Sequence, residues 1–66
     1  MKKLTNREKQ IAELLLKGMN NREIAKTLFI SIHTVKANLE NIYEKYNIHN
    51  RVSLALFILK NDLINL

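Results

Sequence analysis

Apolar residues recur at intervals of three and four along most of the chain, a spacing that places them on one face of an α-helix. The clearest case is the stretch SIHTVKANLENIYEKY at residues 31–46. Its apolar positions are Ile32, Val35, Leu39, Ile42, Tyr43 and Tyr46. No stretch alternates as a strand does, so the pattern predicts an all-α fold. The predicted helices are about residues 6–17, 21–28, 32–46 and 51–60.

Residues that favour helix ends stand at the boundaries of these segments. TNRE at residues 5–8 and NNRE at residues 20–23 each have the form of a capping box. In a capping box, the N-cap side chain and an acidic side chain three positions later each accept a hydrogen bond from the other's backbone N–H group. Further N-cap candidates are Ser31 and Asn50, and the residues suited to a left-handed helix end are Gly18 and Asn47.

The second and third predicted helices are separated by only about three residues. That connection is too short for an antiparallel return but suits the sharp angle of a helix-turn-helix motif, here about residues 21–46. The first turns of the third helix would then project outward, and an α-helix fits the major groove of B-DNA. The candidates for contacts to base edges are His33, Lys36, Ala37 and Glu40.

Three of these side chains have a chemical reason to contact bases. The Lys36 ammonium can donate to guanine O6 or N7, the Ala37 methyl can contact the thymine methyl, and Glu40 can accept from cytosine N4. Glu40 has two alternative interpretations: it could repel the phosphate backbone in wrong registers, or it could simply keep the helix soluble. For His33 the alternative is a solvated polar residue that makes no contact.

Short polar side chains and the start of a helix predict contacts to phosphate oxygens. The candidates are Thr34, Asn38 and Asn41 on the third helix, and Asn20, Asn21 and Arg22 at the start of the second. Asn20 is also an N-cap, and Thr34 could instead be only a first-turn partner of Ser31. Both alternatives stay open from the sequence alone.

The chain has 66 residues, of which 47% are hydrophobic and 26% charged, which fits a single domain over residues 1–66. A net charge of +5 favours a polyanionic partner such as nucleic acid, although small soluble proteins also reach such values without one. Nothing resembles a signal peptide, and the longest apolar run, residues 54–59, is too short to cross a bilayer. We therefore expect a cytoplasmic protein with no membrane partner.

Catalytic and ligand-binding chemistry has little support in the sequence. The chain has no cysteine, hence no disulfide and no thiolate metal site, and its two histidines have no partner at helical ligand spacing. A single glycine cannot form a phosphate-cradling loop. We expect no enzyme activity, no metal, no cofactor and no small-molecule ligand.

The last predicted helix carries two apolar stripes, more than a core of this size can cover. The stripe expected to face the core is Val52, Ala55, Leu56 and Leu59. The stripe expected to be exposed, and to form a two-fold dimer interface, is Leu54, Phe57 and Ile58. Two alternatives remain: the tail LINL at residues 63–66 folds over the exposed stripe, or the stripe binds a helix of another protein.

Five short motifs occur together and cover nearly all of residues 4–60. They are Leu-Thr-x-Arg-Glu at the start, Asn-x-Glu-Ile-Ala in the second helix, Ile-Ser at the turn, Thr-Val-Lys in the third helix and Asn-Arg-Val before the fourth. Together they resemble the LuxR-type (GerE-like) helix-turn-helix domain at the C-terminus of many bacterial response regulators and quorum-sensing regulators. The resemblance implies the effector domain of a two-component response regulator, regulating transcription as a dimer on promoter DNA at the nucleoid. RNA polymerase is a further candidate partner.

By position, the resemblance implies base contacts from Lys36 and Ala37 and a phosphate contact from Thr34. The chain departs from the family at Asn38, usually histidine, and at Glu40, often basic or neutral, so a target sequence cannot be transferred from relatives. Sigma-factor helix-turn-helix domains have similar sequence motifs, but the Asn-Arg-Val motif argues against assigning this chain to them. The chain would be either an excised C-terminal domain or a free-standing regulator, and we favour the first.

Overall fold

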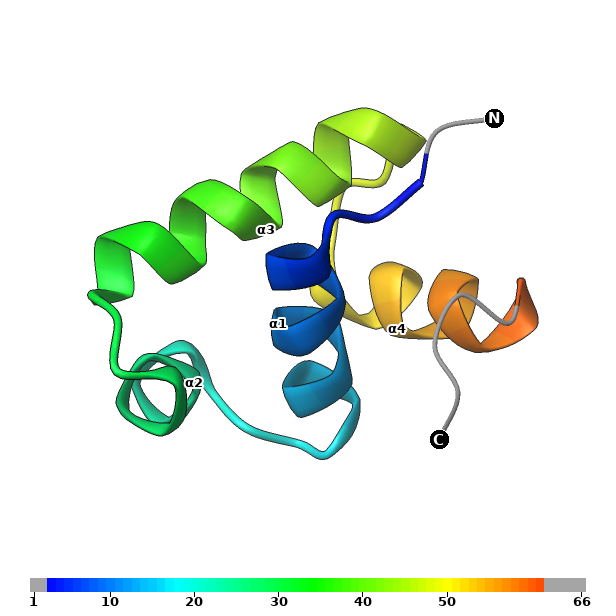
Figure 1. Ribbon diagram of the computed structural model, residues 1–66. Helices are drawn as coiled ribbons and strands as arrows, with labels where there is room; N and C mark the ends of the chain where they lie inside the picture. The colour runs from blue at the N-terminus through cyan, green and yellow to red at the C-terminus, as the bar shows by residue number, and fades with distance from the viewer. Residues whose placement is uncertain (1–2, 62–66) are drawn as a thin grey trace.

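The computed structural model describes residues 3–61, and within that range it consists of helices joined by short turns, with no strand (Figure 1). The predicted all-α, four-helix fold is confirmed. The helices are α1 (Asn6–Leu16), α2 (Asn21–Leu28), α3 (Ile32–Tyr46) and α4 (Arg51–Lys60). Three have the predicted bounds, whereas α1 ends one residue earlier than expected because Lys17 is its C-cap.

Both predicted capping boxes are present. In the first, the Glu8 backbone N–H donates to Thr5 Oγ1 at 3.1 Å, and the Thr5 N–H donates to Glu8 Oε1 at 2.8 Å. In the second, the Glu23 N–H donates to Asn20 Oδ1 at 2.8 Å and the reciprocal bond is 2.9 Å. Because each box involves residues three positions apart, these helix starts are specified locally.

The first three helices end on a residue with positive φ. Gly18 (φ 89°) and Asn47 (φ 54°) occupy this conformation as predicted. Phe29, with a φ of 57° at the end of α2, was not predicted, because a bulky side chain is unfavourable there. After each of these residues, the next backbone N–H donates to a carbonyl oxygen in the last turn of the preceding helix. The Ile30 N–H, for example, donates to the Ala25 oxygen at 3.0 Å. These bonds satisfy carbonyl oxygens that the end of a helix would otherwise leave without a partner.

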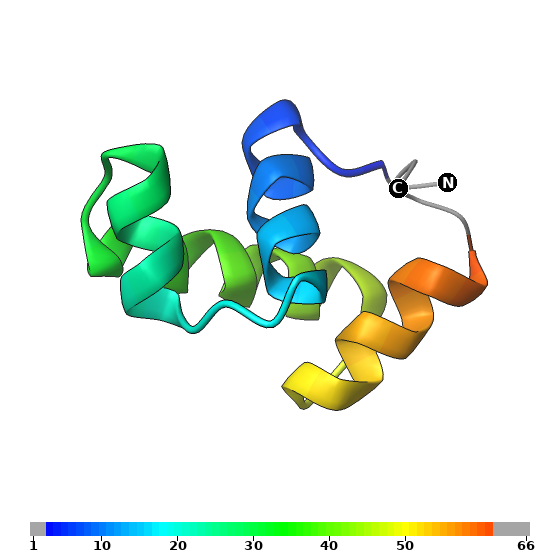
Figure 2. The ribbon, with the colours of Figure 1, turned by 90° about the horizontal axis from the view of Figure 1, so that it is seen from below.

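α1 packs against each of the other helices, and α2 and α4 lie on opposite sides of it (Figures 1 and 2). α3 crosses α1 and also packs against α2 near its own N-terminal end (Figure 1). One apolar cluster fills the space between the four helices. Its buried members are Leu4, Ile11, Ala12, Leu15, Ile24, Ala25, Val35, Leu39, Ile42, Leu54 and Ile58.

The prediction for the two stripes of α4 is wrong. Leu54 and Ile58 are 0% and 1% exposed and belong to the core, so they are not available to a second chain. The exposed apolar side chains are Val52, Leu56 and Leu59, at 70%, 62% and 54%. Because α4 is apolar on nearly all sides, its periodicity does not say which side faces α1. The tail LINL at residues 63–66 lies outside the described residues.

Phe57, the third residue of the predicted dimer stripe, is half-buried. Its ring lies 4.8 Å from that of Tyr46, centroid to centroid, with an interplanar angle of 36°. Burial of Tyr46 raises the pKa of its phenol. Phe57 therefore joins α4 to the C-terminal end of α3 within one chain, and it too is not part of an open dimer surface.

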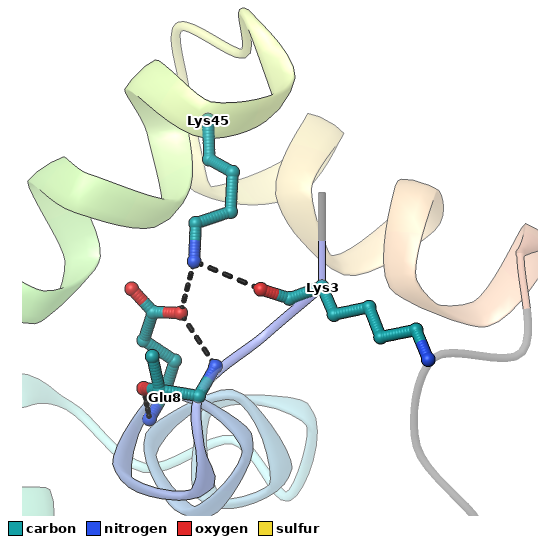
Figure 3. Close-up of polar contacts among 4 residues, drawn as sticks. Lys3, Glu8 and Lys45 are labelled. Atoms are coloured by element: carbon teal, nitrogen blue, oxygen red, sulfur yellow. Dashed lines mark hydrogen bonds and ion pairs between the residues drawn. The ribbon is translucent and has the colours of Figure 1, made fainter. Parts of the chain in front are cut away.

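A buried ion pair also holds the C-terminal end of α3 (Figure 3). The Lys45 ammonium donates to the carboxylate of Glu8, which is only 3% exposed, and to the backbone oxygen of Lys3 at 3.0 Å. Burial raises the pKa of Glu8, but hydrogen bonds from Lys45 and the Thr5 backbone, with the Lys45 charge, outweigh it and hold the pKa below its usual value. Glu8 thus caps the start of α1 and, through Lys45, holds the C-terminal end of α3.

Candidate nucleic-acid interface

The N-terminal half of α3 is packed on one side and open on the other. Val35 and Leu39 are buried in the core, whereas the side chains on the outer face are exposed. This face contains all four residues predicted to contact bases: His33, Lys36, Ala37 and Glu40. Since successive turns of a helix repeat the same face, these residues form one continuous strip. The geometry therefore leaves the predicted base-contacting face accessible.

On one flank of that strip is an open hollow of about 700 Å³. Its lining residues come from α2, α3 and α4, and they are Asn20, Asn21, Arg22, Ile32, Lys36 and Arg51. Three of them are cations and none is a carboxylate. The N-terminal N–H groups of α2 add partial positive charge at the same place. The fold thus brings the predicted phosphate-contacting start of α2 next to Lys36 of α3.

A second, smaller hollow adjoins the first and shares Asn21, Lys36 and Arg51 with it. Glu40 lines this second hollow together with Leu39 and Tyr43. Glu40 therefore lies close to the cationic flank and shares this hollow with Lys36, Arg51 and Asn21, the first residue of α2. That exposed position fits all three interpretations of Glu40: an acceptor for cytosine, a charge that repels phosphate, or a solvated residue of the helix surface.

The opposite flank of the strip carries the remaining predicted phosphate contacts. Ser31 Oγ accepts from the Thr34 N–H at 3.1 Å, and the two hydroxyls lie 3.0 Å apart. Thr34 is thus a capping partner of Ser31, the alternative considered for it, while remaining exposed. Asn38 is half-buried, and its Nδ2 donates to the Thr34 carbonyl oxygen at 2.8 Å. One N–H group of the Asn38 amide is therefore already used within α3, and fewer remain to donate to a phosphate.

Asn41 is exposed but does not lie beside the cationic hollow. It lines a different depression with Glu8, Glu44 and Lys45, where two carboxylates are present. The six predicted phosphate contacts therefore divide into two groups on either side of α3, with Asn20, Asn21 and Arg22 on the cationic side. The sequence did not show this division, because it depends on where α2 packs.

Arg51 was not predicted as a site residue. It is half-buried at the start of α4, where its Nη1 donates to Asn21 Oδ1 and its Nη2 donates to the Met19 backbone oxygen, each at 2.8 Å. The only signal in the sequence was its place in the Asn-Arg-Val motif. The position of its partners, some thirty residues earlier in the chain, depends on the tertiary fold.

Within residues 3–61, no group of three or more histidine, cysteine, aspartate or glutamate side chains is arranged to bind a metal ion. In the same range, no helix is both long and apolar enough to span a membrane.

This chain resembles known bacterial regulatory proteins. Residues 2–58 match the family described as "Bacterial regulatory proteins, luxR family". The transcriptional regulatory protein LiaR of Bacillus subtilis (strain 168) is 40% identical over 62 residues, covering 94% of this chain and 29% of that protein. The oxygen regulatory protein NreC of Staphylococcus carnosus (strain TM300) is 39% identical over 62 residues, with the same shares of each chain.

A solved structure is also similar in fold. It is that of the response regulator ChrA of a heme-sensing two-component system, with a TM-score of 0.91 and 38% sequence identity. The match covers 97% of this chain and 32% of the other. The chain therefore spans about 30% of the length of these relatives.

Proposed function

Because the chain belongs to the LuxR family of bacterial regulatory proteins, a family of DNA-binding transcription regulators, we propose that α3 binds in the major groove of promoter DNA. The observation that carries the proposal is the exposed polar strip of α3 with a cationic hollow along its flank. An α-helix in the major groove has base edges in front of it and a sugar-phosphate backbone on each side. The strip has groups suited to the base edges, and its two flanks have groups suited to the two sugar-phosphate backbones.

Base contacts come from the strip itself. Lys36 donates to guanine O6 or N7, and Ala37 contacts a thymine methyl. Glu40 accepts from cytosine N4 or excludes wrong registers by repelling phosphate. His33, in the first turn of α3, is the fourth base-contacting candidate, and it is exposed at the end of the helix nearest α2.

Phosphate contacts come from the flanks. On the cationic side, one DNA strand contacts the start of α2, where the backbone N–H groups and the side chains of Asn20, Asn21 and Arg22 donate to its phosphates. On the other side, Thr34, Asn38 and Asn41 face the second strand. Asn38 makes the weakest of these contacts, because one of its donors is already used within α3.

We further propose that two chains bind as a dimer through α4. Val52, Leu56 and Leu59 are exposed apolar residues on one helix, and burying them against a second copy removes them from water. A two-fold contact of this kind places two α3 helices on half-sites about one helical turn of DNA apart. The test is the solution mass as a function of concentration, with and without Leu56→Lys. A wild-type monomer at high concentration and on DNA contradicts the dimer.

The wider setting is part of the proposal. The chain would act in the bacterial cytoplasm, at the nucleoid, as the effector domain of a two-component response regulator, with RNA polymerase as a candidate partner. Relatives described as a transcriptional regulatory protein and as a response regulator support this setting. It predicts binding to DNA without any metal or small-molecule cofactor in this domain.

The deciding experiment is a binding titration on duplex DNA at several salt concentrations. A protein that neutralises several phosphates loses affinity steeply, with a log–log slope of about −0.9 for each phosphate on B-DNA. Selection of bound sites from random duplexes should then enrich a common sequence. A flat salt dependence, or no preference for the enriched sites, would contradict a sequence-specific DNA-binding function and favour a protein-interaction module instead.

A further inference from the structure

We infer that Arg51 is a positioning residue of the DNA interface: it holds the Asn21 amide with its N–H donors directed outward to phosphate. The inference deepens the proposed function and rests on it. It concerns an α4 residue that acts on DNA through α2, rather than by its own contact with a phosphate.

Arg51 connects two segments of the chain that precede it by about thirty residues. Its guanidinium is a planar fork of donors with no acceptor, and its two terminal nitrogens bond two oxygens from different segments. One is Asn21 Oδ1 in the first turn of α2, and the other is the backbone oxygen of Met19 in the α1–α2 connection, each at 2.8 Å. Arg51 therefore fixes both the start of α2 and the chain leading into it.

The bond from Arg51 determines the orientation of the Asn21 amide. An amide can present either its oxygen or its nitrogen, and its neighbours decide which. Since a guanidinium only donates, it selects the oxygen of Asn21 and leaves the Nδ2 hydrogens for another partner. Phosphate oxygens only accept hydrogen bonds. The bond to Arg51 thus gives Asn21 the polarity that a phosphate contact needs.

Asn21 and Arg51 line the larger hollow together with Arg22 and Lys36, at the start of α2. The Glu40 carboxylate lines only the smaller hollow beside it. An amide oxygen turned toward a phosphate in the larger hollow would repel it, whereas an amide nitrogen donates to it. Because Arg51 is half-buried and both terminal nitrogens already have acceptors, its main contribution is to orient Asn21.

The test compares Arg51→Lys, Arg51→Gln, Asn21→Ala and the double variant Asn21→Ala with Arg51→Gln. Arg51→Lys keeps the charge but loses the fork, so it separates geometry from electrostatics. Lys60→Gln is the matched control for Arg51→Gln, because it removes one positive charge from the other end of α4. Affinity and salt slope are measured on a labelled duplex of mixed sequence, well below the melting temperature of each variant. Side-chain amide resonances of Asn21 are recorded by NMR in the free protein.

We expect Arg51→Lys and Arg51→Gln each to lower affinity on the order of tenfold, with the salt slope unchanged. The Asn21 amide resonances should shift in both variants without DNA. In the Asn21→Ala background, Arg51→Gln should cost almost nothing more, because the two residues act as one unit. Lys60→Gln should leave the Asn21 resonances in place and have a much smaller effect on affinity.

Several outcomes would overturn the inference. Wild-type affinity in Arg51→Lys, or a salt slope reduced by about one phosphate in Arg51→Gln alone, would show that Arg51 acts through its charge. Full affinity in Asn21→Ala would show that the Asn21 amide is not used, even if an Arg51 variant failed to fold. If wild type binds no duplex in dilute buffer, the proposed function fails together with the inference. Binding by wild type with no effect of these variants defeats the inference alone.

Discussion

The two ends of α3 are held in opposite ways. At the C-terminal end, Lys45 bonds Glu8 and the Lys3 carbonyl, and Tyr46 lies against Phe57 of α4. At the N-terminal end, the helix packs only on its inner side, and Lys36 on the outer face is exposed. The C-terminal end of α3 is therefore its anchored end, and the N-terminal end, with its outer face exposed, is its presented end. A small domain can thus expose half of a helix if it fixes the other half through side chains of different elements.

Ile42→Ala should have the largest effect, because it removes buried contacts near the anchored end. Ile42 is 0% exposed, and truncating such a side chain lowers the free energy of unfolding by about 2–5 kcal/mol. Urea denaturation followed by circular dichroism measures the change. The exposed neighbour Asn41 is the control, since Asn41→Ala should change stability by less than about 0.5 kcal/mol. Equal, small changes at both positions would mean that this end is not an anchor.

Glu8→Gln tests the ion pair while keeping the capping box, because glutamine can still accept from the Thr5 N–H. At neutral pH it should lower the free energy of unfolding by about 1.5–3 kcal/mol, the range for hydrogen bonds to charged groups. Lys45 would be left half-buried without its carboxylate partner.

The same variant predicts a change in pH dependence. The folded-state pKa of Glu8 lies below its ordinary value of 4.5, so the charged carboxylate stabilises the fold fully above that pH. This stability is lost as pH falls through the folded-state pKa. Denaturation at several pH values should therefore show that the free energy of unfolding falls more steeply toward acid pH in wild type than in Glu8→Gln. Parallel curves would contradict a lowered pKa for this carboxyl.

Lys36→Ala tests the presented end. We expect a loss of about 1–3 kcal/mol in binding to a selected site and a relaxed preference at one base position, with stability unchanged. Arg22→Ala is the comparison, since a phosphate contact should weaken all duplexes alike and reduce the salt slope by about one. If Lys36→Ala lowers affinity for selected and random duplexes by the same factor, its base-contacting role is wrong.

Phe29→Asn gives the smallest expected effect and concerns the turn that leads into the presented end. Phe29 is 94% exposed with a φ of 57°, whereas Asn47 occupies the equivalent place after α3 with a φ of 54°. Asparagine tolerates this conformation better, so the variant should gain about 1 kcal/mol in stability. Chemical denaturation measures the gain. A loss instead would show that the Phe29 ring stabilises the folded chain.

The fold was predictable because its determinants are local. Each helix start depends on a side chain and a backbone N–H three positions apart, as in Thr5 and Glu8 or in Asn50 and Ser53. The candidate site was predictable in part: Lys36 and Arg22 followed from helix position and chemistry. Their meeting in one hollow did not, because it requires knowing how α2 packs on α3.

Local sequence patterns specify the four helices, most of their ends and the polar face of α3, because hydrogen bonds and side-chain periodicity within a helix act over three or four residues. Packing between the helices determines which side of α4 is buried, since Leu54 and Leu56 are equally apolar and only the contact with α1 distinguishes them. It also decided the partners of Arg51 and Lys45, which lie thirty or more residues away. Contacts over such distances depend on the arrangement of all the helices, which no short stretch of sequence contains.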